Sequence, residues 1–144
     1  MSTLAMLALA AALLAGSFVA ATATMRAARV VRAGVVAETV GRRALARGVA
    51  GWRAADDSLA VGAASVRTYA ESAAVALDSA RVRLRVQRIA LARYVVSADV
   101  EVPAAGPLLA RRRMRVLLER PPSPDSTVVL APRPIARWAV AELY

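Results

Sequence analysis

LAMLALAAALLAGSFVAATATM, residues 4–25, is a run of 22 residues without a charged side chain. As an α-helix rising about 1.5 Å per residue it would be about 33 Å long, and a bilayer's hydrocarbon core is about 30 Å thick. We therefore expect residues 1–25 to form the membrane-anchor half of a helix. The large apolar residues expected to face lipid are Leu4, Leu7, Leu9, Leu13, Leu14, Phe18 and Val19.

A cleaved secretory signal peptide is the alternative interpretation of this segment. Ala21 and Ala23 flank Thr22 in a small-residue pattern of the kind that signal peptidases cleave. The apolar run is, however, longer than the 7–15 residues typical of the apolar part of a signal peptide. The length favours an anchor that is retained.

The helical pattern continues beyond Met25. Through residues 26–53, small or apolar residues recur every three or four positions, and the first proline is Pro103. This period predicts an amphipathic stem continuous with the anchor. The stem's expected helix-packing residues are Val30, Gly34, Gly41, Leu45, Val49 and Trp52. Glycines occur at 34, 41 and 48, and this spacing of seven either lets another helix approach closely or simply reflects neutral positions in an alanine-rich helix.

Residues 54–80 contain few large apolar side chains, and we expect a loop there with short helical or strand pieces. The adjacent Asp56 and Asp57 are expected to cap or turn the chain. From residue 81 the hydrophobic period changes to two, as in RVRLRVQR at 81–88, which predicts a strand with one buried face.

The same alternation recurs farther along the chain. It predicts strands over residues 92–102 and 111–120, with a hairpin turn near 89–93. Residues 127–130 can form a fourth short strand, and residues 132–144 an edge strand or a short helix. The expected fold is therefore α+β: a long N-terminal helix, made of anchor and stem, packed on a three- to four-stranded antiparallel meander. Residues 54–144 would form the small sheet domain.

The composition limits the chemistry that the chain can perform. The sequence has no Cys and no His, so the commonest thiol and imidazole ligands, nucleophiles and bases are missing. No phosphate-binding loop or metalloprotease motif occurs. We expect no enzyme activity, no cofactor, no metal site and no small-molecule substrate.

The net charge is +10 at pH 7, and all 20 basic residues are Arg. Codon usage in a GC-rich genome, which favours Arg codons over Lys codons, accounts for part of this excess. An anion-binding stripe is the functional alternative, because Arg side chains match phosphate geometry. Its expected members are Arg81, Arg83, Arg85, Arg111 and Arg113. Nucleic acid is a conceivable partner, but the stripe lacks interleaved aromatic residues for base stacking.

Asp99 and Glu101 lie two residues apart in a predicted strand, and their side chains should share one face. Two readings are open for this pair. It can form a weak cation site, or it can form surface salt bridges with the many neighbouring arginines.

The order of these elements resembles the type IV pilin and pseudopilin family, and is most similar to its minor-pilin or pilus-assembly (PilX-like) type. The stretches that carry the resemblance are STLAMLALAAALLAG, VVAETVGRRALARGVAGW, RVRLRVQRIALARYVVSADVEV and RRRMRVLLER. They match the family's long apolar helix, its amphipathic continuation and its antiparallel sheet.

The resemblance implies a non-enzymatic subunit of a type IV pilus or type II secretion apparatus, assembling through its N-terminal helix with other pilin-like subunits. It also implies a single-pass protein of the bacterial inner membrane whose C-terminal domain is periplasmic or extracellular. Most pilins carry a glutamate early in the mature helix, and none occurs in residues 4–8. This departure suggests an accessory rather than a repeating subunit.

Three alternatives stay open at this point. Arg26, Arg29 and Arg32 follow the apolar run, and the positive-inside rule taken alone predicts a cytoplasmic domain. The chain can instead be a membrane-tethered basic domain that binds anionic lipid, DNA or polysaccharide. It can also be an exported protein released from its signal peptide.

Overall fold

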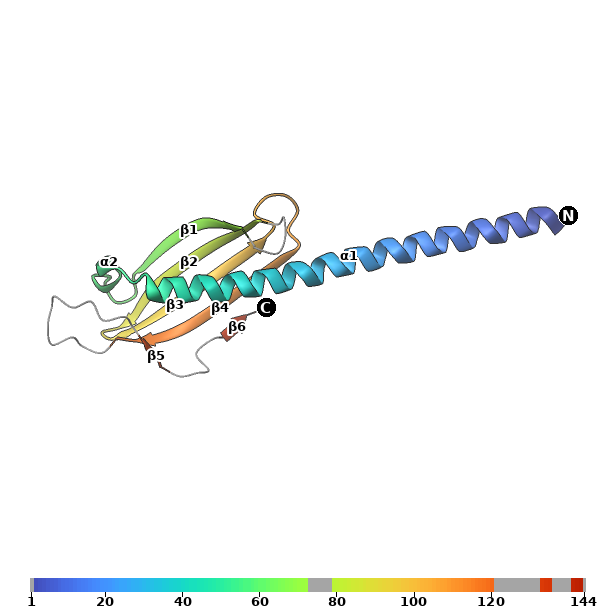
Figure 1. The fold of residues 1–144 in the computed structure, drawn as a ribbon. Coiled ribbons are helices and arrows are strands. Elements are labelled where there is room, and N and C mark those ends of the chain that lie inside the picture. The colour runs from blue at the N-terminus through green and yellow to red at the C-terminus, as the bar shows by residue number, and fades with distance from the viewer. Residues whose placement is uncertain (1, 73–78, 121–132, 136–140, 144) are drawn as a thin grey trace. The chain divides into compact units, whose positions relative to one another are not determined.

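The computed structural model describes residues 2–72, 79–120, 133–135 and 141–143. Its elements follow the expected α+β order of one long helix and then an antiparallel sheet (Figure 1). Two compact units divide the chain, Met1–Arg32 (the N-terminal unit) and Ala33–Tyr144 (the C-terminal unit). The boundary falls within the expected stem.

Helix α1 spans Ser2–Ala50 without a break. The sequence explains this continuity, because the helix is rich in alanine and leucine, contains no proline, and carries its glycines singly. Arg47 lies in the last turn, where a cation interacts favourably with the helix dipole. The amide of Gly51 closes the final turn by donating to the Arg47 carbonyl at 2.7 Å.

Four long strands form an antiparallel meander in the order β1–β2–β3–β4. They are β1 (Ala64–Ser72), β2 (Ser79–Ala90), β3 (Arg93–Val102) and β4 (Ala110–Glu119). The hairpin between β2 and β3 turns at residues 91–92, inside the expected range, with a register shift between Arg88 and Ala90. The predicted fold class is confirmed.

Two short strands extend the sheet at β4. They are β5 (Arg133–Pro134) and β6 (Ala141–Leu143), and both pair antiparallel with β4. They fall within the C-terminal segment for which an edge strand was one of two expectations. The fourth strand expected at 127–130 lies outside the described residues.

Strand β1 falls in a region where the sequence favoured a loop with short pieces. The side chains of β1 that face the helix are Ser65, Arg67, Tyr69 and Glu71, which pair in register with the helix-facing residues of β2. A strand whose inward side is polar lacks the alternation of apolar and polar residues by which strands are recognised. The short helix α2 (Ala54–Asp57) precedes it and contains the expected Asp56–Asp57 turn.

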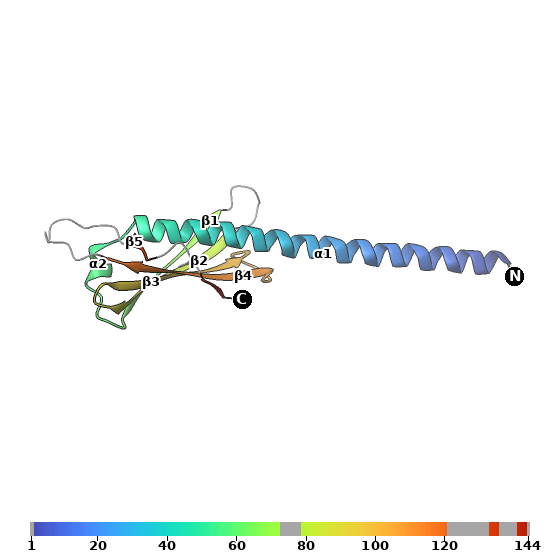
Figure 2. The same cartoon turned by 90° about the horizontal axis from the view of Figure 1, so that it is seen from below.

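The core lies between the C-terminal part of α1 and one face of the sheet (Figure 2). Alternate residues of β2, β3 and β4 point at the helix, and their exposed fractions are near zero. The buried sheet residues include Val82, Leu84, Val86, Val96, Ala98, Val100, Met114 and Leu118. The helix contributes Ala33, Ala37, Val40, Ala44 and Leu45. Its residues are mostly small, so the helix backbone lies close to the sheet.

The expected stem stripe and the buried face of α1 overlap in part. Gly41 and Leu45 are buried, and Gly34, Val49 and Trp52 are partly buried. Val30 differs from the expectation, because its side chain is 49% exposed and Ala33 begins the buried face instead. Trp52 lies beyond the end of α1, so it packs from the connection to α2.

Glycines at seven-residue spacing permit the close approach of helix and sheet. A β-carbon added to Gly41 would overlap Met114 Cε. A β-carbon added to Gly48 would lie 2.9 Å from Leu84 Cδ2 and 3.2 Å from Leu84 Cδ1. Within the C-terminal unit, the element that approaches these glycines is therefore the sheet, rather than the second helix considered from the sequence.

We expect Gly48→Ala to destabilise the C-terminal unit by about 1–3 kcal/mol, because the added methyl group overpacks against Leu84. Gly34→Ala is the matched control. Its added carbon would lie 3.8 Å from Arg112 Nη2, an ordinary contact, and replacing a helical glycine should stabilise by up to about 1 kcal/mol. Urea unfolding in detergent micelles, followed by tryptophan fluorescence, measures both. Equal shifts in the two variants would contradict the close-packing account.

Candidate functional site: the basic outer face of the sheet

The face of the sheet turned away from α1 carries two columns of arginines. Arg81, Arg83 and Arg85 alternate with the buried residues of β2, and Arg111, Arg113 and Arg115 occupy the same face of β4. Strand β3 runs between them. Its register places Glu101 between Arg81 and Arg111, Asp99 between Arg83 and Arg113, and Ser97 between Arg85 and Arg115.

Among the described residues of this outer face, Asp99 accepts the most side-chain hydrogen bonds. Arg111 donates two hydrogen bonds to its carboxylate, from Nε at 2.9 Å and from Nη2 at 2.7 Å. Arg113 Nη2 donates a third at 2.8 Å. One carboxylate thus binds two guanidinium groups from β4, an arrangement in which planar forks match planar oxygens.

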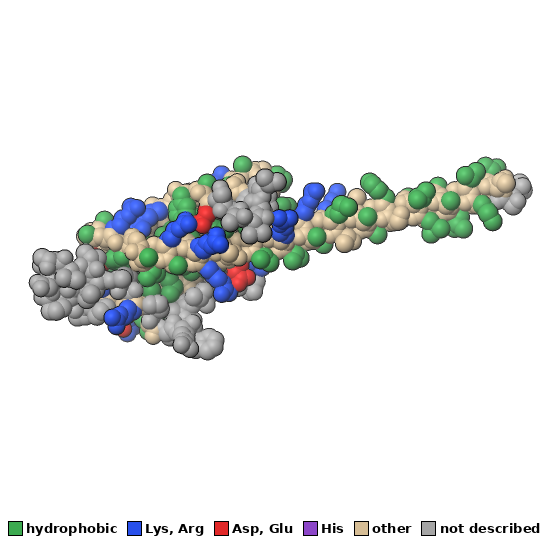
Figure 3. Space-filling model, in the orientation of Figure 1, with side chains coloured by type: hydrophobic (Ala, Val, Ile, Leu, Met, Phe, Trp, Pro, Cys, Tyr) green, Lys and Arg blue, Asp and Glu red, His purple; other side chains and the backbone are tan. Residues whose placement is uncertain are grey.

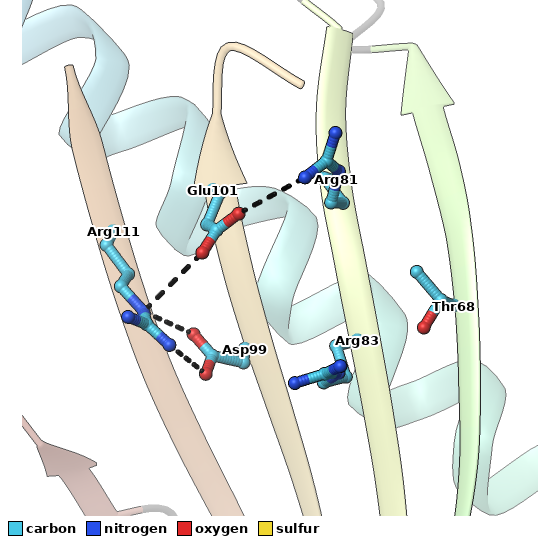
Figure 4. Close-up of a pocket in the computed structure, with 6 residues that line it drawn as sticks. All are labelled: Thr68, Arg81, Arg83, Asp99, Glu101 and Arg111. Carbon is cyan, nitrogen blue, oxygen red and sulfur yellow. Dashed lines mark hydrogen bonds and ion pairs between the residues drawn. The ribbon is translucent and has the colours of Figure 1, made fainter. Parts of the chain in front are cut away.

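Glu101 makes longer ion pairs, each 3.9 Å, with Arg81 and Arg111. A depression of about 380 Å³ opens beside these pairs (Figure 4). Its lining residues are Thr68, Arg81, Arg83, Asp99, Glu101 and Arg111. In Figure 4, Arg83 points from β2 toward Asp99, and no dashed line joins the two side chains.

The structure brings all five arginines of the expected anion-binding stripe onto one face. Arg81, Arg111 and Arg113 are paired with carboxylates of β3. Arg83 and Arg85 have no ion pair with any residue that the structure describes. Arg115 belongs to the same face but was not included in the expected stripe, although its alternation with Met114 and Val116 places it on the side of Arg113.

The Asp99–Glu101 pair forms salt bridges with arginines, which is the second of its two readings. Among the described residues, the side-chain hydrogen bonds to the Asp99 carboxylate come from guanidinium groups. Within the described ranges, no group of three or more His, Cys, Asp or Glu residues is placed to hold a metal ion.

The hydrogen bonds from Arg111 are the largest cause that lowers the pKa of Asp99 to about 2. Partial burial acts in the opposite direction, and the Arg113 hydrogen bond lowers the pKa further. Because the folded-state pKa lies below the ordinary value of 3.8, ionised Asp99 stabilises the fold above about pH 4. That contribution is lost as the pH falls toward about 2.

We expect the acid titration of stability to reveal this contribution. Wild-type protein should lose stability between about pH 4 and pH 2 as Asp99 takes up a proton. Asp99→Asn should flatten the curve in this window, and Arg111→Gln should do so too, because it removes the main cause of the shift. Urea midpoints measured across pH 2–6 give the slopes. A slope that Asp99→Asn leaves unchanged would show that other groups carry the acid dependence.

A second polar cluster lies at the α2 corner, on the other face of the sheet. Asp56 is 1% exposed and accepts hydrogen bonds from the Arg53 amide at 3.1 Å and from Ser65 Oγ at 2.9 Å. Arg67 of β1 forms an ion pair with the same carboxylate. This fully partnered carboxylate fixes α2 to the first strand, which supports a structural role for the predicted turn.

Aromatic rings complete the corner. Trp52 and Tyr94 pack edge to face with ring centroids 5.0 Å apart, and Trp52 Nε1 donates to Asp57 at 2.9 Å. The Arg88 guanidinium lies 5.6 Å from the Tyr94 ring centroid and donates to the carbonyls of Asp57 and Leu59. The Trp52 ring and its Nε1 therefore both have contact partners within the fold. Trp138 lies outside the described residues.

Asp56→Ala should destabilise the C-terminal unit by about 3–5 kcal/mol, because it leaves the largely buried Arg67 without its counter-ion. Glu38→Ala is the comparison. Glu38 makes one exposed helical pair with Arg42 at 2.6 Å, and such pairs contribute about 0.3–0.5 kcal/mol. Urea unfolding of the two variants measures both effects. A loss for Asp56→Ala as small as that for Glu38→Ala would contradict the structural role.

The expected anchor residues all lie in the N-terminal unit and are exposed. The exposed fractions of Leu4, Leu7, Leu9, Leu13, Leu14, Phe18 and Val19 lie between 63% and 75%. Figure 3 shows apolar side chains along both visible edges of this part of the helix. By length and composition α1 can span a membrane, and none of its most apolar 18-residue window is buried in the protein.

No family model, curated protein or solved structure matches this chain. A long apolar N-terminal helix and an antiparallel sheet are compatible with a pilin-like architecture.

Proposed function

We propose that this protein is a non-enzymatic, pilin-like accessory subunit of a type IV pilus or type II secretion apparatus. It assembles through its N-terminal helix with the membrane and with other pilin-like subunits. One observation carries the proposal: the apolar half of α1 is exposed along its length, whereas the other half of the same helix is packed against a sheet.

This division of one helix has a simple physical reading. Eleven large apolar side chains from Leu4 to Val31 are at least 49% exposed, far more apolar surface than a soluble helix presents. Lipid or neighbouring helices can cover such a surface. In a bilayer, helices associate through van der Waals packing of small residues, which the alanine-rich segment supplies.

In the proposed topology, the protein crosses the bacterial inner membrane once and its sheet domain is periplasmic or extracellular. The arginines that follow the apolar run favour the opposite orientation. The orientation is therefore the first property to test, and a chain without native cysteine suits the test well.

Single cysteines report the orientation. Leu91→Cys places a thiol at a side chain that is 82% exposed in the β2–β3 turn, and Ala98→Cys places one in the core. We expect a membrane-impermeant maleimide to label Leu91→Cys in cells whose outer membrane alone is permeabilised. Ala98→Cys should be labelled only after denaturation, which controls for folding. Labelling of Leu91→Cys only after lysis would place the domain in the cytoplasm and overturn the pilin-like topology.

Phe18→Cys, at 71% exposure, tests assembly in the same cells. A photoactivatable benzophenone maleimide attached to this thiol should, on irradiation in the membrane, join the protein to a subunit that also has an apolar N-terminal helix followed by a sheet domain. Leu91→Cys is the control that should not cross-link. A protein whose N terminus begins near Thr24 and that is found in the soluble fraction would favour export with a cleaved signal and contradict both anchored models.

A further inference from the structure

The arginine columns of the outer face are only half neutralised. At the end near Glu101, carboxylates of β3 pair with Arg81, Arg111 and Arg113. Ser97 is the next outer-face residue of β3 beyond Asp99, and it carries a hydroxyl rather than a carboxylate. Its register partners on β2 and β4 are still arginines. Arg85 and Arg115 thus flank Ser97, Arg83 lies two residues along β2 opposite Asp99, and none of these arginines has an ion pair to any described residue. We call these four residues the Ser97 cluster.

We propose that the Ser97 cluster binds a phosphate group of an oligophosphate ligand or a phospholipid headgroup. This inference is independent of the pilin-like function and goes beyond it. It assigns a phosphate ligand to the outer face of the sheet, which the proposed assembly through the N-terminal helix does not involve.

The spacing of the sheet places the three guanidinium groups within reach of one ligand. Strands lie about 4.8 Å apart, so Arg85 and Arg115 flank Ser97 at neighbouring positions, and Arg83 lies about 6.7 Å along β2 from Arg85. All three side chains are exposed on the same face. Long Arg side chains can therefore converge above the Ser97 hydroxyl.

The hydrogen bonding of the Asp99 carboxylate indicates which kind of anion three arginines would bind. Its carboxylate, with two oxygens and one charge, accepts three hydrogen bonds from two arginines. A terminal phosphate offers three oxygens and up to two charges, which can engage three guanidinium groups. The Ser97 cluster has one arginine more than the carboxylate site beside it, so its chemistry favours phosphate over carboxylate.

The surroundings of the cluster favour phosphates over nucleobases. Tyr69 and Tyr94, the aromatic residues of β1–β4, have register partners on the helix-facing side of the sheet. The outer face of these strands therefore has no aromatic platform for stacking single-stranded bases.

Binding of tripolyphosphate to the full chain in phosphatidylcholine nanodiscs, measured by calorimetry, tests the proposal. We expect the triple variant Arg83→Gln/Arg85→Gln/Arg115→Gln to bind about tenfold or more weakly, because charge-assisted hydrogen bonds are lost. The control Arg26→Gln/Arg29→Gln/Arg43→Gln removes the same charge from exposed positions on α1 and should change affinity by less than about threefold.

A lysine variant separates a shaped site from charge alone. Arg83→Lys/Arg85→Lys/Arg115→Lys keeps the charge but removes the bidentate forks, so its affinity should fall between wild type and the glutamine variant. Urea unfolding curves like those of wild type show that each variant is folded. Equal weakening in the outer-face and α1 glutamine variants would overturn the proposal, as would no binding by wild type.

Vesicles containing phosphatidylglycerol distinguish the source of the phosphate. Capture of the nanodiscs by these vesicles, lost in the outer-face glutamine variant but kept in the α1 variant, assigns a lipid headgroup. Tripolyphosphate binding without capture assigns a soluble oligophosphate, and both outcomes support the proposal. Binding of duplex DNA without binding of tripolyphosphate would overturn it, because a polymer's field rather than a phosphate site would then be recognised.

Discussion

The close approach of helix α1 to the sheet at Gly41 and Gly48 is the contact on which the rest of the C-terminal unit depends. The sheet has one apolar face and the helix one small-residue face, and neither is stable in water alone. Gly41 and Gly48 have no side chain at the points where Met114 and Leu84 pack against the helix, so the two surfaces lie close together. Alanines at 33, 37 and 44 maintain the same short separation along the helix.

This contact also determines what the opposite face of the sheet can do. With every second residue of β2, β3 and β4 committed to the core, the intervening residues must face away from the helix. Those residues are largely arginines on β2 and β4, with Asp99 and Glu101 on β3 between them. Part of the basic charge is thereby neutralised within the sheet, and the remaining part is concentrated around Ser97.

The N-terminal half of α1 has a different relation to the fold. Its apolar residues contribute nothing to the core of the C-terminal unit, since the buried face of the helix begins at Ala33. By length and composition this part of the helix could span a bilayer. The function proposed above assigns its exposed apolar surface to lipid and to neighbouring subunits.

The long helix, the three alternating strands and the turn between the first two of them could be predicted from the sequence, because each shows a hydrophobic period that depends only on neighbouring residues. The sequence also placed five arginines on one face. Only the tertiary structure revealed β1, whose inward residues Arg67 and Glu71 are polar because they pair with Asp56 and Arg47. Register between strands is likewise a long-range property, so only the fold shows which arginines meet Asp99 and that Arg115 joins Arg83 and Arg85 around Ser97.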